Sequence, residues 1–178
     1  MDINDFIANI SSQGIAKAST YEVIVTRPGG NGDMQMFKYR ADGIDWPGRN
    51  ITTTDSNYTG VPYKIGTAVT YNDINMSVIL SEDFREKIYI EEWQDMIVGK
   101  HRKEESGNMF NLSFYDDYIG TVEILQYNEI DELVYSVKLI DAYPTTLGSM
   151  TSSWASSAEI LKLPVSFTFR YYKDKKEV

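Results

Sequence analysis

Cysteine is absent from the 178-residue chain, and histidine occurs once, at His101. These absences exclude a disulfide framework, a thiol nucleophile, a zinc site built on cysteine and any metal site that needs two histidines. Long apolar runs are also missing, since no stretch reaches the roughly 18 residues that a membrane-spanning helix needs. The first residues, 1–6, carry acids where a signal peptide has basic residues. We therefore expect no metal, no cofactor, no membrane insertion and no secretion through a signal peptide.

Basic residues are outnumbered. The chain has 17 Lys and Arg against 26 Asp and Glu, which gives a formal net charge of −9. A protein that grips nucleic acid neutralises phosphates with clustered lysines and arginines, so this charge argues against binding of that kind. The charge is compatible with a protein past which DNA must slide.

The residues that are present favour β-structure. Aromatic residues make up 13% of the chain and include 13 tyrosines, which is typical of sheets. Apolar and polar residues alternate with period two in 20–27, 133–142 and 161–171, as in half-buried strands. No repeat or linker divides the chain, and its length fits one domain. We predict a single mainly β domain over residues 1–178, a barrel or sandwich of about seven to nine strands.

One segment carries strong helix signals. Ser81 precedes two acids that complement the helix dipole, and Gly99 follows the last periodic residue. These signals predict a helix over 82–98, which packs on a sheet through one apolar stripe: Tyr89, Ile90, Trp93, Met96 and Ile97. Phe84 and Ile88 project from the opposite side and indicate a partner. Residues 1–19 are expected to form an N-terminal arm, helical over 2–10 or only partly ordered.

A polar hairpin is expected to project from the domain. Pro47 and Gly48 favour a tight turn that joins Met34–Asp45 to Arg49–Tyr63, so the hairpin spans residues 34–63. Residues 49–60 contain few large hydrophobic side chains. Such an arm is not expected to be buried in its own domain, and it reaches out towards something else.

No catalytic constellation stands out. A serine nucleophile needs a histidine base, and His101 lies in a charged loop without a matching signature. With 26 acids a carboxylate pair is not excluded, but no two of them are singled out. We expect a protein that is not an enzyme. A polar arm, an apolar patch on a helix and long strands with open edges together favour a structural or assembly protein.

The C-terminal third carries a family resemblance. The segment Ala142–Gly148, followed by Trp154 and by a last strand ending in Phe169–Tyr172, resembles the C-terminal part of the tail tube proteins of contractile-tailed bacteriophages. Gly14–Val25 is similar to the start of that family, and the segment ending in Trp93 to its helix. The resemblance covers most of the chain at low identity, and its most specific element is the spacing of Tyr-Pro-Thr, Leu-Gly and Trp.

The resemblance implies a fold and a role. Tube proteins of this family, of type VI secretion systems and of pyocin-like particles share a fold in which six copies close a barrel around a lumen. The rings stack into a tube, a sheath surrounds the tube, and genome DNA passes through it without specific binding. The implied partners are further copies of the chain, the sheath protein, and baseplate and tape-measure proteins. The implied location is the virion tail, assembled in the cytoplasm of the host bacterium.

In this picture the sequence features acquire roles. The turn of the hairpin would contact the neighbouring ring through six consecutive residues: Asp45, Trp46, Pro47, Gly48, Arg49 and Asn50. The helix would lie outside the barrel, where the charged loop after it would face the sheath through Lys100, Arg102, Lys103 and Glu104. A lumen lined with carboxylates would repel DNA, and the candidate acids are Glu123, Asp131 and Glu132.

Two alternatives stay open. A baseplate protein of the same fold that initiates the tube would have a similar sequence, and its copy number per virion would distinguish it. A monomeric β-sandwich module that binds carbohydrate would also be rich in tyrosine. Such a module would not form rings or tubes.

Overall fold

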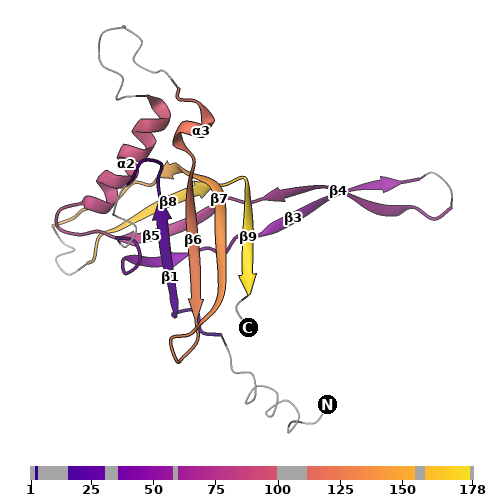
Figure 1. Cartoon of the computed structure of the whole chain (residues 1–178), viewed down its shortest axis with the longest axis horizontal. Helices are drawn as coiled ribbons and strands as arrows, with labels where there is room; N and C mark the ends of the chain where they lie inside the picture. The colour runs from indigo at the N-terminus through magenta and orange to yellow at the C-terminus, as the bar shows by residue number, and fades with distance from the viewer. Residues whose placement is uncertain are drawn as a thin grey trace.

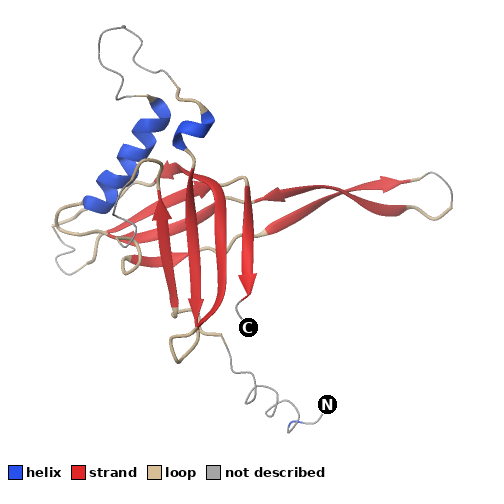
Figure 2. Ribbon diagram, viewed as in Figure 1, coloured by secondary structure: helices blue, strands red, loops and turns tan. Residues whose placement is uncertain are grey.

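The computed structural model of the chain describes residues 3, 16–30, 36–57, 60–99, 112–154 and 159–176. Figure 1 shows a two-sheet body, with helices at one end and a long ribbon extending from its side. The elements in chain order are β1 (Tyr21–Thr26), β2 (Ala41–Ile44), β3 (Arg49–Ser56), β4 (Tyr63–Tyr71), β5 (Ile74–Ile79), α2 (Arg85–Val98), α3 (Tyr115–Tyr118), β6 (Gly120–Tyr127), β7 (Leu133–Leu147), β8 (Lys162–Thr168) and β9 (Tyr171–Lys176). The prediction of a mainly β fold is confirmed (Figure 2).

Two antiparallel sheets make up the body. The first sheet has the order β1-β6-β7-β9, and the second has the order β7-β8-β5-β2. Strands of the two sheets cross at a large angle in Figure 1, as in an orthogonal packing. Among the described strands, β1, β9 and β2 each pair with one strand only, so each of them has an open edge.

The long strand β7 belongs to both sheets. Its first part pairs with β6 and β9, and its last part, Tyr143–Leu147, pairs with β8. The register passes from Thr121 opposite Ile140 to Gly120 opposite Ala142, so Asp141 is an extra residue on β7. Asp141 has a φ of 56°, in the left-handed region. A bulge of this kind bends a strand, and here it turns β7 from one sheet into the other.

The core lies between the sheets and follows from the alternation of their strands. Strands β1, β5, β6, β7 and β8 contribute alternating residues to one continuous buried cluster, as period-two patterning requires. The first sheet supplies Val23, Val25, Val122, Val137 and Leu139, and the second supplies Ile74, Met76, Val78, Leu163, Val165 and Phe167. Each of these side chains is 0 or 1% exposed.

Helix α2 closes one end of this core. The predicted stripe is the face that packs inward, with Tyr89, Ile90 and Trp93 buried. The Trp93 Nε1–H donates to the carbonyl oxygen of Tyr118 at 2.7 Å, so the indole is buried without an unpaired donor. A Cβ at Gly120 would lie 2.6 Å from the Trp93 ring, so only glycine fits beneath it. The helix ends as predicted, with Gly99 in the left-handed conformation and its N–H bonded to the carbonyl of Asp95.

The start of α2 differs from the prediction. The helix begins at Arg85 rather than 82, because Phe84 adopts a left-handed φ of 54°, and Ser81 is not its N-cap. The Ser81 hydroxyl and backbone N–H instead donate to the Glu86 carboxylate at 2.8 and 2.9 Å. Arg40 Nε lies 3.1 Å from the other oxygen of this carboxylate, which is 2% exposed. Burial raises the pKa of Glu86, but these hydrogen bonds, that of its own backbone N–H and the Arg40 charge outweigh it, so the pKa is lowered.

The projecting hairpin exists, but its predicted position is wrong. Strands β3 and β4 pair with each other and the chain reverses between Ser56 and Tyr63, whereas the predicted 34–63 hairpin reversed at Pro47 and Gly48. Residues 36–40 form turns rather than a strand, and β2 pairs with β5. Pro47 lacks a backbone N–H, so residues 45–48 interrupt a ribbon that runs from β2/β5 into β3/β4 instead of reversing it. We call residues 49–71 the arm.

Of the predicted N-terminal arm, residues 1, 2 and 4–15 lie outside the described residues. Residues 16–19 are exposed and lead into β1. That residues 1–178 form a single domain stays a prediction.

Candidate assembly surfaces

The outer face of the second sheet is small and polar. Its side chains point away from the core because their neighbours along β5 and β8 point into it. We call it the polar face, and it comprises Asp42, Asp45, Asp73, Asn75, Ser77, Thr146, Lys162, Ser166 and Thr168, with Ile79 and Pro164 at one end. Three carboxylates against one lysine give it a net charge of −2.

Hydrogen bonds between side chains hold the polar face together. Asn75 Nδ2 donates to Asp45 Oδ2 at 2.9 Å, and the Ser166 hydroxyl donates to Asn75 Oδ1 at 2.8 Å. The Thr168 hydroxyl donates to the Asp73 carboxylate. Lys162 Nζ lies 2.7 Å from Asp42 Oδ2. These bonds occupy the polar groups with one another, so the face offers few free donors to an anionic ligand.

The outer face of the first sheet is different in kind. Registered residues across it form a row of Ile24, Glu123, Lys138 and Lys173. The row therefore mixes a large aliphatic side chain with charges of both signs. A face of this composition suits contact with protein better than a surface past which a polyanion slides.

The three acids predicted for the lumen come from two elements. Glu123 is in the middle of β6, whereas Asp131 and Glu132 lie in the turn that follows the strand. At about 3.4 Å per residue, Glu123 is roughly 14 Å from the end of β6. Asp131 has a left-handed φ of 57°, and Glu132 accepts a hydrogen bond from Asn128 Nδ2 at 3.1 Å. That these three acids line a lumen stays a prediction.

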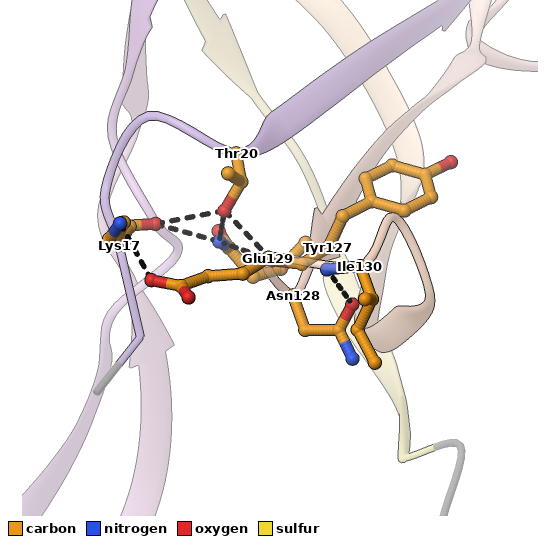
Figure 3. Close-up of polar contacts among 7 residues, drawn as sticks. Lys17, Thr20, Tyr127, Asn128, Glu129 and Ile130 are labelled. Atoms are coloured by element: carbon orange, nitrogen blue, oxygen red, sulfur yellow. Dashed lines mark hydrogen bonds and ion pairs between the residues drawn. The ribbon is translucent and has the colours of Figure 1, made fainter. Parts of the chain in front are cut away.

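Figure 3 shows what that turn does contact. The Thr20 hydroxyl donates to the carbonyl of Tyr127 at 2.8 Å, and Lys17 Nζ lies 2.6 Å from Glu129 Oε1. The Asn128 side-chain oxygen accepts from the N–H of Ile130 at 3.0 Å. These contacts therefore hold the turn between β6 and β7 against the segment that enters β1.

The six residues predicted to contact a neighbouring ring lie at the base of the arm and not at its tip. Asp45 accepts from Asn75 on the polar face, and the Trp46 ring lies 5.8 Å from that of Tyr135. Asn50 Nδ2 donates to Asn72 Oδ1 at 3.2 Å, across the ribbon. Trp46 is 41% exposed, so its indole is only half covered by the body.

The arm exposes apolar side chains that the sequence analysis did not single out. Ile51, Tyr63, Ile65 and Val69 are between 45 and 63% exposed. Every residue of β3 and β4 is exposed except Ser56 and Tyr71, which are half-buried. A two-stranded ribbon by itself is marginally stable in water, so the arm is built to be covered by another surface.

Two further predicted surfaces have different outcomes. Phe84, just before α2, and Ile88 of α2 are 40 and 48% exposed and form the predicted second apolar patch. The four residues predicted to face the sheath, Lys100, Arg102, Lys103 and Glu104, lie outside the described residues, as does His101.

The described part of the chain contains no candidate metal site and no candidate membrane-spanning helix. There, no three Asp, Glu or His side chains are grouped so as to hold a metal ion. Its helices are also too short or too polar to cross a membrane.

Comparison with protein families decides the relationship. The model of a family described as phage tail tube protein matches residues 3–175. The chain belongs to the phage tail tube protein family. Its members are structural tube proteins, components of the tail of a virion. Among curated protein sequences, none matches the chain.

Solved structures share the fold at low identity. One is the sheath–tube complex of PVC, an extracellular contractile injection system, in its extended state: TM-score 0.65, 13% identity, 96% of this chain and 97% of that chain covered. Another is the baseplate of the anti-feeding prophage, with TM-score 0.62 and 12% identity over 91% and 97% of the two chains. Hcp1 from Flavobacterium johnsoniae has TM-score 0.51 and 12% identity over 89% and 96%. The predicted tube-protein fold is thereby confirmed.

Proposed function

We propose that the chain is the repeating subunit of the inner tail tube, in which six copies close a ring and stacked rings form a conduit for genome DNA. The observation that carries this proposal is the arm, which extends from a body of the tail tube family and exposes apolar side chains that the body does not cover. A monomer gains nothing from such a ribbon, whereas a polymer of identical subunits supplies the surface that covers it.

In this assembly the polar face lines the channel. Its acidic and hydroxyl side chains bond to one another, so a passing DNA phosphate meets net negative charge and few unsatisfied donors. The repulsion acts over a Debye length of about 8 Å at physiological salt, which is enough to keep DNA off the wall. Asp42, Asp45 and Asp73 are the acids that this arrangement favours, in place of Glu123, Asp131 and Glu132.

The remaining surfaces are assigned to the implied partners. Asp45–Asn50 supports the arm at its base, beside the ring contact. Helix α2 lies on the outside, with the loop containing Lys100, Arg102, Lys103 and Glu104 turned to the sheath. Baseplate and tape-measure proteins are the expected partners at the tube's end and in its lumen, in a virion tail assembled in the host's cytoplasm.

Removal of the arm tests the proposal. A variant in which Ile51–Val69 is replaced by Asn-Gly keeps the body intact, because none of the replaced side chains belongs to the core cluster. We expect its thermal unfolding midpoint to match that of the full chain while hollow tubes, seen by negative-stain microscopy for the full chain, are lost. Normal tubes from the shortened variant would overturn the role of the arm, and a strictly monomeric full chain would overturn the tube.

A second candidate is a tube-initiating protein of the baseplate. It is favoured by the similarity in fold to a chain of the anti-feeding prophage baseplate. The copy number of the chain per particle distinguishes the two roles, because a tube subunit occurs in many rings and an initiator in one or two.

A further inference from the structure

A β-bulge divides the arm into two halves. Thr52 lies opposite Ala68 and Thr53 lies opposite Gly66, so Thr67 has no partner on β3. The Thr67 hydroxyl donates to the carbonyl oxygen of Thr52 at 3.1 Å, which ties the extra residue to the facing strand. Because side chains alternate along a strand, one extra residue reverses which face each later side chain occupies.

The reversal moves apolar side chains to opposite faces of the ribbon. Near the body, Ile51 lies opposite Val69, and these two form the base patch. Beyond the bulge, Ile65 lies opposite Thr54 and Tyr63 lies opposite Ser56, on the other face of β3 from Ile51. Ile65 and Tyr63 form the tip patch.

Gly66 provides an independent check on this geometry. Its register partner is Thr53, which shares a face with Ile51. A Cβ placed on Gly66 would lie 3.1 Å from Ile51 Cγ2, so the two residues lie on the same face. Ile65, the next residue of β4, therefore points to the opposite face. If Thr67 were instead paired with Thr53 in a regular ladder, Ile51, Tyr63, Ile65 and Val69 would all share one face.

Both patches are exposed to solvent in the isolated chain. Because they lie on opposite faces of the ribbon, one flat protein surface can bury only one of them. Ile51 and Val69 are 63 and 51% exposed, and Tyr63 and Ile65 are 58 and 45% exposed. Burial of a large apolar side chain contributes about 1.5–3 kcal/mol, so each patch is a substantial source of binding energy. An arm with one apolar patch on each face is suited to two separate contacts.

The position of each patch indicates where its contact lies. Tyr71, at the foot of β4, has its ring 5.6 Å from Phe169 and 5.5 Å from Tyr172, which fixes the foot of the arm against the body. Val69 shares the face of Tyr71, so the base patch lies close to β9, whose outer edge is open among the described strands. Tyr63 is eight residues from Tyr71, roughly 26 Å further along at about 3.3 Å per residue.

Charge indicates that the occupants are further copies of this chain. The arm holds Arg49 and Lys64 against Asp55, a net charge of +1, which leaves −10 for the rest of the chain. The positively charged arm can approach the negatively charged body of another copy without the electrostatic repulsion that acts between two such bodies.

We propose that the two patches contact two different copies: the base patch a lateral neighbour in the same ring, next to the open edge of β9, and the tip patch a subunit of the adjacent ring. The inference rests on the proposed tube and adds that ring closure and ring stacking use separate halves of the arm. The bulge at Thr67 is the feature that makes the two contacts separable.

Two exchanges of neighbouring residues test this separation without changing composition or charge. Ile51→Thr with Thr52→Ile moves an isoleucine of the base patch to the opposite face. Lys64→Ile with Ile65→Lys does the same for the tip patch. Asp55→Ser with Ser56→Asp is the matched control, because it exchanges two polar residues of the same ribbon. Each variant is compared with the unchanged chain by sedimentation velocity and negative-stain microscopy.

We expect the base exchange to abolish rings and tubes, and the tip exchange to leave rings that do not stack, while the control forms tubes like the unchanged chain. Equal loss of rings in both exchanges, tubes in both, or stacking lost by the base exchange alone would overturn the separation. A control that fails like the tip exchange would also overturn it, because the apolar patch would not be the cause. If the unchanged chain forms neither rings nor tubes, the proposed function fails instead.

Discussion

The buried side chain of Glu86 stabilises the fold through its hydrogen bonds and its ion pair. Its buried carboxylate accepts two hydrogen bonds from Ser81 and pairs with Arg40. Glu86→Gln removes the charge and leaves these donors with a weaker acceptor, so we expect the free energy of unfolding at pH 7 to fall by about 1–3 kcal/mol. Urea denaturation measures it. Asp83→Asn, at an exposed surface pair with Arg85, is the control and is expected to cost less than about 1 kcal/mol.

The same residue predicts a dependence on pH. The folded pKa of Glu86 is lowered from its ordinary value of 4.5, so the folded state binds fewer protons at this site than the unfolded state does. The stabilisation is therefore complete above about pH 4.5 and is lost as the pH falls through the folded pKa. The difference in stability between the native chain and Glu86→Gln should shrink below pH 4.5, and a difference that grows on acidification would contradict this assignment.

At the scale of elements, the two ends of β4 have different roles although both carry tyrosine. Tyr71 contacts the rings of Phe169 and Tyr172, whereas Tyr63 is 58% exposed in the arm. We expect Tyr71→Leu to lower the free energy of unfolding by about 1–3 kcal/mol, because each ring pair contributes about 0.5–1.5 kcal/mol. Tyr63→Leu should leave the unfolding of the unassembled subunit unchanged. Equal effects of the two changes would show that the arm is part of the body's cooperative unit.

Among the elements, the buried face of α2 was predictable from the sequence and the position of the hairpin was not. The stripe of Tyr89, Ile90 and Trp93 on α2 was readable because helical periodicity and burial coincide over several turns. The hairpin was misplaced because Pro47 and Gly48 are turn signals in the sequence, while pairing over β2/β5 and β3/β4 makes them an interruption. Turn residues report local backbone preference, and strand pairing overrides that preference wherever a longer ribbon has more hydrogen bonds to gain.

At the scale of the whole molecule, the absence of cysteine allows a direct test of which face lines the channel. Thr146 is exposed on the polar face, opposite Ser166. In tubes of Thr146→Cys, we expect the single thiol to react with a small maleimide and not with a maleimide carrying a large polymer, because only the small reagent enters a narrow lumen. Mass spectrometry measures the labelled fraction.

Two controls accompany that measurement. Unassembled Thr146→Cys should react with both reagents, and tubes of Glu82→Cys, next to the proposed outer helix, should also react with both. Labelling of Thr146→Cys tubes by the large reagent would place the polar face outside the channel, even if the tube itself is confirmed.

The sequence by itself determined the class of the molecule: a cysteine-free, acidic, mainly β chain with one amphipathic helix and a resemblance to tail tube proteins. Composition, periodicity and capping report on neighbours along the chain, and these features need nothing more. The surfaces were decided only by tertiary structure. Asp42, Asp73 and Ser166 share a face because β2, β5 and β8 pair, and Ile51 and Ile65 lie on opposite faces because Thr67 bulges out of the ladder. Both facts depend on register between distant segments, which hydrogen bonding across strands sets and which no single stretch of sequence contains.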